Sequence, residues 1–176
     1  MLKKFYPYEY VNSVFDIDYE KLFSLGYRGI IFDIDNTLVH HGDDSTIEVD
    51  NLFHSIQTLG FKTLLLSNND EKRVKRFLKN IDSPYICDAG KPETANYLKA
   101  VDMMDLQKKQ VIFIGDQIFT DILGANLSGI ASILVKFIRL PGENKIGKRR
   151  HIENLILKIY KFRKKYTHRL GNIDVN

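Results

Sequence analysis

Five short apolar runs alternate with segments of helical hydrophobic spacing, and this alternation constrains the fold more than any other feature of the chain. The runs cover residues 29–33, 63–67, 85–87, 111–115 and 131–135. Strands that alternate with helices form a parallel sheet, because each helix returns the chain to the edge where the next strand starts. We therefore predict an α/β, Rossmann-like fold with a parallel five-stranded sheet and helices on both faces.

Helix signals occupy the segments between these runs. Residues 46–59 carry apolar side chains at helical spacing, and Gly60 is a natural helix end. Asn69 or Asp70 can cap the next helix, and Pro92 suits the first turn of a third. The predicted helices thus fall where a parallel sheet needs its crossover connections.

Length and charge divide the chain into three parts. A chain of 176 residues with 44% hydrophobic content can bury one core of ordinary size. We predict a lead-in at residues 1–28 that packs on the domain, a core at residues 29–144, and a basic helical tail at residues 145–176. The tail carries ten Lys/Arg against two acidic residues, whereas the rest of the chain has more acidic than basic residues.

The cysteine content and hydropathy indicate a cytoplasmic protein. The single cysteine, Cys87, excludes an internal disulfide framework and fits a reducing compartment. It follows two apolar residues, so we expect it in or near the core. No stretch of the sequence reaches the roughly 18 apolar residues of a membrane span.

Two carboxylates follow the first apolar run. Asp33 and Asp35 stand two positions apart, so both can face one side of the strand end. Two neighbouring carboxylates repel each other, which raises one pKa unless a cation lies between them. The pair is therefore an acidic turn, a dyad that shares a proton, or a divalent metal site with one aspartate free to act as nucleophile.

Polar residues at the ends of the later strands extend this constellation. In open α/β sheets, ligands bind beyond the carboxyl ends of the strands, where these residues should meet. Ser67 and the backbone N–H groups of residues 67–69 can donate to an anion. Lys91 offers a positive charge for phosphate and can keep a carboxylate ionised. Asp116 can join Asp33 on a hard cation such as Mg²⁺, and Asp121 lies nearby in the sequence.

These motifs resemble those of haloacid dehalogenase (HAD) superfamily phosphatases. Residues 33–37 (DIDNT) look like the first motif, and Ser67, Lys91 and residues 115–121 fall where the second, third and fourth are expected. The resemblance covers about residues 25–140. The stretches 67–69 and 115–124 are similar to the YqeG group of subfamily IIIA, which is related to mitochondrial phosphatidylglycerophosphate phosphatases.

The resemblance implies a role for each of these residues. Asp33 would attack phosphorus to give an aspartyl-phosphate, and Asp35 would protonate the leaving alcohol and then activate water. The expected phosphate-binding residues are Ser67, Asn68 and Lys91. The expected Mg²⁺ ligands are the Asp33 carboxylate, the Asp35 main-chain carbonyl and Asp116, with Asp121 in support. An acid at position 35 favours phosphate over halide chemistry, because dehalogenases of the superfamily lack it.

The short connection between the first two strands bears on the substrate. Many relatives insert a large cap domain, but residues 38–62 hold little more than one helix and a turn at residues 40–45. An uncapped site favours bulky phosphate monoesters, with phosphatidylglycerophosphate as one candidate. His40 and His41 are interpreted as exposed loop residues. The alternative is a HAD-fold binding protein that docks to RNA, protein or membrane through its tail.

The tail has the pattern of a basic amphipathic helix. Its apolar residues at helical spacing are Ile152, Leu155, Ile156, Ile159 and Phe162, with lysines and arginines around them. Such a helix either docks its apolar stripe on the domain with solvated charges, or lies on an anionic membrane through residues 145–169 as a peripheral anchor. Nucleic acid is the weaker candidate partner, because no aromatic-basic motif specifies it. The sequence indicates no oligomeric state.

Overall fold

A six-stranded, all-parallel sheet forms the centre of the molecule, with the strand order β1-β6-β5-β2-β3-β4. The computed structural model describes residues 2–143 and 147–175. The strands are β1 (Glu9–Val11), β2 (Gly29–Phe32), β3 (Lys62–Leu66), β4 (Tyr85–Ile86), β5 (Val111–Gly115) and β6 (Ala131–Val135). The predicted α/β class is confirmed. The sheet has one strand more than predicted, because the lead-in adds β1 to the edge of β6.

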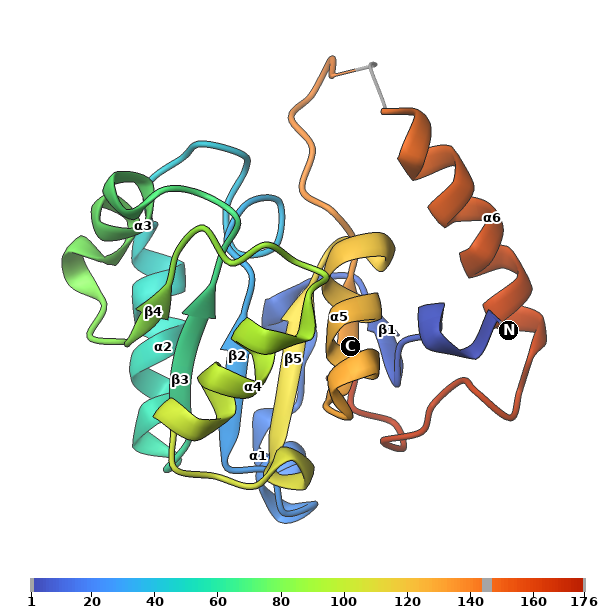
Figure 1. The fold of residues 1–176 in the computed structure, drawn as a ribbon, viewed down its shortest axis with the longest axis horizontal. Coiled ribbons are helices and arrows are strands. Elements are labelled where there is room, and N and C mark those ends of the chain that lie inside the picture. Colours follow the sequence, from blue (N-terminus) through green and yellow to red (C-terminus); the bar gives the residue numbers. More distant parts are fainter. Residues whose placement is uncertain (1, 144–146, 176) are drawn as a thin grey trace.

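Helices cover both faces of the sheet (Figure 1). They are α1 (Tyr19–Ser24), α2 (Ile47–Thr58), α3 (Glu71–Phe77), α4 (Thr94–Met103), α5 (Leu123–Ser128) and α6 (Lys148–Phe162). Short 3₁₀ turns span Leu2–Phe5, Val14–Asp16, Leu78–Asn80 and Lys108–Gln110, and a π-helical turn spans Ile118–Ile122. Between β2 and β3 the described chain contains α2 and one loop, so no cap domain is inserted there.

Local sequence explains where the helices begin. Thr46 accepts a hydrogen bond from the Val49 N–H and so caps α2, and Asp70 caps α3 in the same way. Of the two predicted caps for α3, Asp70 is therefore the one used. Pro92 lies two residues before α4 begins at Thr94, so it precedes the first helical turn instead of lying in it.

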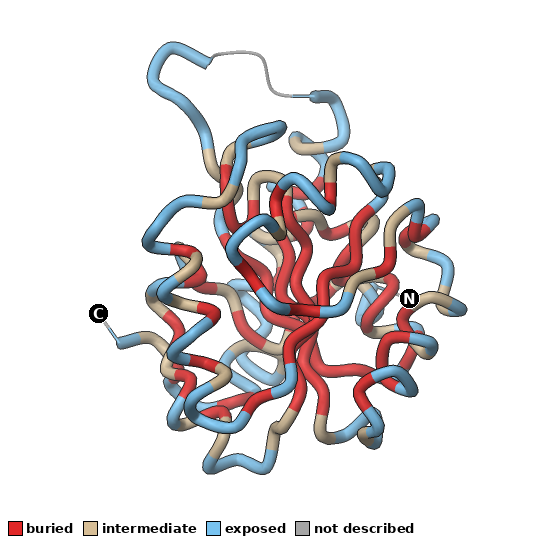
Figure 2. Tube along the Cα trace, turned by 90° about the vertical axis from the view of Figure 1, so that its left-hand side faces the viewer, coloured by how far each residue is buried: buried red, intermediate tan, exposed pale blue. Residues whose placement is uncertain are grey.

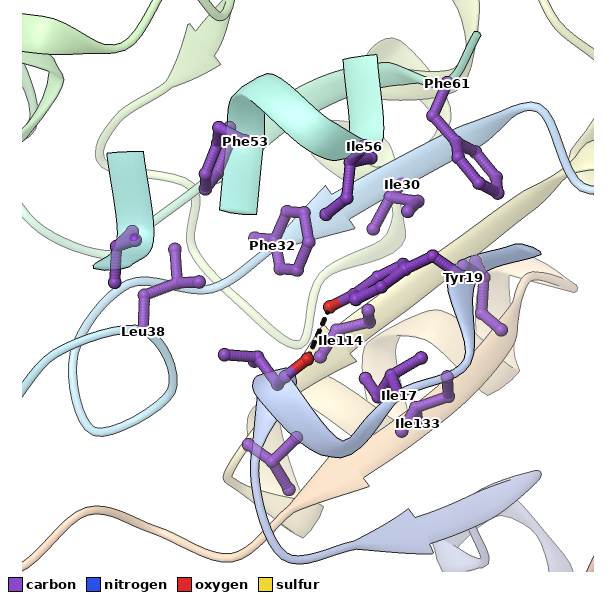
Figure 3. Packing of buried hydrophobic residues seen from close by; sticks show 14 of the residues in the cluster. Ile17, Tyr19, Ile30, Phe32, Leu38, Phe53, Ile56, Phe61, Ile114 and Ile133 are labelled. Carbon is purple, nitrogen blue, oxygen red and sulfur yellow. Dashed lines mark hydrogen bonds between the residues drawn. The ribbon is translucent and has the colours of Figure 1, made fainter. Parts of the chain in front are cut away.

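Strand alternation divides the core between the two faces. Ile30 and Phe32 of β2 face α1 and α2, together with Ile112 and Ile114 of β5. Figure 3 shows this packing, including the buried Tyr19 hydroxyl that donates to the Val14 carbonyl at 2.8 Å. The opposite face packs on α4 and α5 through other strand residues, among them Ile31, Leu64 and Phe113. Strands buried on both faces explain the continuous apolar runs in the sequence.

The lead-in belongs to the folded body. Tyr6 and Val14 are buried, whereas Phe15 is exposed, so most but not all of the aromatic lead-in covers the domain. Cys87 is half-buried against the core, as predicted. The predicted boundary between core and tail at residues 144 and 145 lies outside the described residues. Among the described residues, no helix combines the length and apolar character needed to cross a membrane.

The tail helix α6 docks at the β1 edge through only part of the predicted apolar stripe, because Ile156 is buried and Ile159 is half-buried against the domain. Its buried residues are Glu153, Ile156 and Tyr160, which pack near Tyr6 and the turn that follows β5. The expected docking stripe is largely exposed, because Ile152, Leu155 and Phe162 lie on the outer face. The helix is rotated in this way because Glu153 and Arg150 bind polar groups of the domain, as described below.

Candidate active site

The carboxyl ends of the strands meet at one edge of the sheet, at the top of Figure 1, and Figure 2 shows exposed loops surrounding the buried strands at that edge. Asp33 directly follows β2, Ser67 follows β3, and Asp116 follows β5. All three side chains are buried. The sheet therefore brings together residues that lie far apart in the sequence.

Asp33 lies at the centre of this group. Its Oδ1 lies 2.5 Å from the Nζ of Lys91, and its Oδ2 accepts a hydrogen bond from the Thr37 hydroxyl at 3.1 Å. Burial raises the pKa of Asp33 to about 6; Lys91 opposes that rise and Asp121 adds to it. Asp33 is thus a shielded carboxylate with a cation beside it.

Three buried carboxylates surround one point. Oxygen atoms of Asp33, Asp116 and Asp121 all lie within 4.8 Å of one another. The Thr37 hydroxyl lies 3.1 Å from Asp33 Oδ2 and 3.4 Å from Asp116 Oδ1, so these two oxygens face the same space. Burial, with Asp121 and Asp33 close by, raises the pKa of Asp116 well above its ordinary value. A hard divalent cation would relieve this repulsion.

Asp121 supports the other groups. Its Oδ2 accepts the N–H groups of Asp116 and Gln117 at 3.1 and 2.9 Å, and its Oδ1 accepts Lys91 Nζ at 2.8 Å. Gly115 makes room for it, since a Cβ at that position would lie 2.5 Å from Asp121 Oδ2. Asp121 therefore holds the turn after β5 and the ammonium of Lys91.

Lys91 joins two carboxylates. Burial alone would lower the pKa of Lys91, but Asp121 and Asp33 raise it above its ordinary value, so the ammonium stays charged. The ammonium has three donors, and the two carboxylates take two of them. One donor is left for an incoming anion.

The segment after β3 holds Ser67 and Asn68 in different ways. The Ser67 Oγ accepts the backbone and side-chain N–H groups of Asn69 at 3.1 and 3.0 Å, which leaves its own hydrogen free to donate. The Asn68 Oδ1 accepts the Lys91 N–H at 2.8 Å, so this amide braces the lysine loop. The backbone N–H of Ser67 donates to the Ile86 carbonyl, and that of Asn69 donates to the Ser67 hydroxyl. These two groups of the predicted anion site at residues 67–69 are therefore already used.

Asp35 follows β2 two residues after Asp33 and is half-buried. It accepts hydrogen bonds from the Gly42 N–H at 3.1 Å, Asn69 Nδ2 at 2.6 Å and Arg73 Nη2 at 2.8 Å. Burial alone would raise the pKa of Asp35, but these bonds together lower it. His41 is exposed, with its Nδ1 3.3 Å from Asp35, and His40 lies 3.3 Å from Glu143.

Three side chains of this site had no assigned role in the sequence analysis. Thr37 could have been found, because it belongs to the DIDNT motif. Arg73 comes from α3 and reaches Asp35. Arg150 comes from α6 and forms an ion pair with Asp116, although the sequence pattern had placed it among solvated tail charges. The sequence around an arginine in a helix does not indicate which strand end that arginine will contact.

Comparisons with known proteins agree with this geometry. A family described as HAD-hydrolase-like matches residues 88–137, a segment that contains Lys91, Asp116 and Asp121. A Bacillus subtilis (strain 168) protein named "Probable phosphatase YqeG" is 42% identical over 137 residues, which cover 77% of this chain and 80% of that protein.

Solved structures share the fold at low sequence identity. An uncharacterized Listeria monocytogenes protein aligns with a TM-score of 0.51 and 19% identity, covering 76% of this chain and 99% of that one. A hydrolase of the haloacid dehalogenase-like family from Brucella suis aligns with a TM-score of 0.50 and 13% identity, covering 67% of this chain and 92% of that one. These similarities concern the fold.

Proposed function

Since the chain belongs to the HAD-like hydrolase family, as its identity to the Bacillus relative shows, we propose that it is a Mg²⁺-dependent phosphatase that acts through an aspartyl-phosphate on Asp33. The observation that carries the proposal is the position of Asp33. It is buried at the end of β2, bonded to Lys91, and within 4.8 Å of Asp116 and Asp121. That environment suits a carboxylate that takes up and releases a phosphoryl group.

The donor atoms fit a magnesium ion. Mg²⁺ prefers carboxylate and carbonyl oxygens and keeps several waters. The Asp33 and Asp116 oxygens that converge near Thr37 supply two ligands, and the Asp35 main-chain carbonyl is the third implied by the family resemblance. Asp121 is already bonded to Lys91 and to two N–H groups, so it supports the site. When bound, the metal would neutralise charge on the phosphoryl oxygens.

The reaction proceeds in two displacements. A carboxylate oxygen of Asp33 attacks phosphorus, the P–O bond to the leaving alcohol breaks, and the alcohol takes a proton from Asp35. Water then gives a proton to Asp35 and attacks the same phosphorus, so the bond to Asp33 breaks and phosphate leaves. The hydrogen bonds that lower the pKa of Asp35 keep it ionised, which is the form that the second step requires, whereas the first step requires its protonated form.

Free donors on two side chains support binding of the phosphoryl oxygens. The third ammonium donor of Lys91 and the hydroxyl hydrogen of Ser67 remain available at the strand ends. Preorganised donors of this kind favour charge that develops in the transition state, because they need no reorganisation when it appears. Asn68 contributes indirectly by fixing the backbone of Lys91.

The lack of a cap domain between β2 and β3 in the described chain supports a bulky substrate. The loop at residues 40–45 is fastened to α3, where Arg73 bonds to the Asp43 carbonyl at 2.7 Å and Arg76 to the Asp44 carboxylate at 2.5 Å. Between β2 and β3 the described chain has no helix other than α2. We therefore favour a macromolecular or lipid phosphate monoester, such as phosphatidylglycerophosphate, over a small sugar phosphate.

The outer face of α6 supports attachment to an anionic membrane. Ile152, Leu155 and Phe162 are 53, 58 and 87% exposed and lie along one side of the helix. Exposed basic residues flank this stripe and continue beyond the helix: Lys158, Lys161, Arg163, Lys164 and Lys165. Apolar insertion and basic charge together match a lipid surface, where each Lys or Arg contributes about 1 kcal/mol. A second copy is disfavoured because two basic faces would meet.

Co-sedimentation with vesicles tests the membrane proposal. Wild type should bind vesicles that contain phosphatidylglycerol and should not bind pure phosphatidylcholine vesicles. Phe162→Glu should weaken the binding, whereas Leu127→Glu, at an apolar position on α5 that is 53% exposed, should not. Equal binding by the two variants, or selective binding to RNA, would reject the membrane surface.

Turnover of an aryl phosphate tests the phosphatase proposal. Wild type should hydrolyse it with Mg²⁺ and lose activity with a chelator, and Asp33→Asn should be inactive. Asp102→Asn, an exposed carboxylate on α4, is the matched control and should retain wild-type activity. Absence of wild-type turnover across lipid, sugar, nucleotide and aryl phosphates would favour a binding protein instead. Strong selectivity for a small sugar phosphate would overturn the bulky-substrate proposal.

A further inference from the structure

We propose that Arg150 is a positioning residue for the metal site, supplied by the tail helix α6 from outside the sheet. Its Nη2 is ion-paired with Asp116 Oδ2, and its Nη1 donates to the Asp116 backbone carbonyl at 2.7 Å. Arg150 therefore contacts both the side chain and the main chain of one proposed ligand. This inference rests on the proposed Mg²⁺ site and names a further residue that controls it.

The contact assigns the two oxygens of Asp116 to different partners. Oδ2 faces Arg150, whereas Oδ1 lies 3.4 Å from the Thr37 hydroxyl, on the side of Asp33. A carboxylate held by one oxygen presents the other in a fixed direction. The planar, forked guanidinium is suited to this task, because it can bind two acceptors at once.

Glu153 holds α6 at the position that brings Arg150 to Asp116. Its Oε1 accepts the N–H groups of Ile118 and Phe119 at 2.8 and 3.2 Å, and its Oε2 accepts Arg150 Nη1 at 3.0 Å. Glu153 is 4% exposed, so the bonds are shielded from water. It therefore links the turn after Asp116 to the same helix that carries the arginine.

An aromatic contact further restricts the guanidinium. The guanidinium of Arg150 lies over the ring of Phe137, 4.7 Å from the ring centroid. Phe137 belongs to the loop that follows β6. Arg150 thus has a carboxylate, a carbonyl, a glutamate and a ring around it. These contacts fix the orientation of the guanidinium and, through it, that of Asp116. Residues that orient metal ligands strongly affect metal affinity.

Direct measurement of Mg²⁺ binding by calorimetry tests the proposal on the full chain. Arg150→Gln should raise the dissociation constant for Mg²⁺ by about 10- to 100-fold, the usual effect of losing a group that orients a ligand. Arg149→Gln removes the same charge from the exposed neighbouring position and should leave the constant unchanged. This matched pair separates positioning from the general effect of one positive charge.

Activity and a conservative variant complete the test. At saturating Mg²⁺, Arg150→Gln should regain most of the wild-type turnover. Arg150→Lys should have an intermediate Mg²⁺ affinity, because lysine keeps the positive charge but lacks the forked guanidinium. Circular dichroism and thermal melting report folding of each variant. Should Arg150→Gln fail to fold, the affinity of Arg150→Lys decides.

The outcomes separate this inference from the proposed function. Equal Mg²⁺ affinity in Arg150→Gln and Arg149→Gln, or tighter binding in Arg150→Gln, would overturn the positioning role while the phosphatase proposal stands. If only Arg150→Lys folds, a wild-type Mg²⁺ affinity in that variant would likewise overturn the positioning role. Absence of Mg²⁺ binding by the wild-type protein would overturn both.

Discussion

The ammonium of Lys91 lies 2.5 Å from the carboxylate of Asp33, and both side chains are buried. Lys91 also lies 2.8 Å from Asp121, so one cation holds two carboxylates together. Ion pairs in such surroundings are costly to break, because the remaining partner is left charged or must take up a proton.

Replacing Lys91 should therefore destabilise the fold. Lys91→Met leaves Asp33 and Asp121 without their shared cation, and we expect the free energy of unfolding in urea to fall by about 3–5 kcal/mol. Lys75→Met is the control, because Lys75 pairs with Glu71 on the exposed side of α3. Equal urea midpoints for the two variants would show that the buried pair contributes little.

Magnesium affinity should depend on pH through Asp33. Its pKa is raised to about 6, so the metal-free protein binds a proton there below that pH. Mg²⁺ must displace this proton, and also any proton on Asp116, whose pKa is raised as well, so its apparent affinity should fall as the pH drops below about 6. Calorimetric titrations across this range measure the effect. A constant affinity on both sides of pH 6 would contradict it.

At saturating Mg²⁺, where the bound cation would keep Asp33 ionised, Arg73 should set the acidic limb of the pH–rate profile through Asp35. Its hydrogen bond helps to keep the pKa of Asp35 below its ordinary value, so Asp35 is ionised at neutral pH. In Arg73→Gln the pKa of Asp35 should rise, and the acidic limb of kcat should shift to higher pH. Arg76→Gln is the matched control, because Arg76 holds the same loop without touching Asp35. The prediction fails if both variants keep the wild-type limb.

The sequence was sufficient to predict the site residues that directly follow the strands. Asp33 and Asp116 come directly after buried apolar runs, and parallel strands bring their carboxyl ends to one edge of the sheet. The position of Ser67 follows from the same rule. Such residues can be found from strand order alone, since the sheet determines where each strand ends.

The helical contributions could not be predicted in this way. Arg150 and Arg73 reach the site only because α6 and α3 pack at particular rotations, which depend on contacts distant in sequence. In α6 the buried Glu153 takes a place that hydropathy would assign to an apolar residue, and of the predicted docking stripe Ile156 is buried whereas Ile152, Leu155 and Phe162 are exposed. The edge strand β1 has only three residues, too few for a periodic signal.

The central claim is that Asp33 becomes phosphorylated during turnover. Mass spectrometry of the protein after rapid acid quenching with an aryl phosphate and Mg²⁺ tests it most directly. We predict that the peptide containing Asp33 gains the mass of one phosphoryl group, and that this species is absent in Asp33→Asn. Steady-state hydrolysis by Asp33→Asn at the wild-type rate, or a phosphoryl group on another residue in the wild type, would contradict the claim.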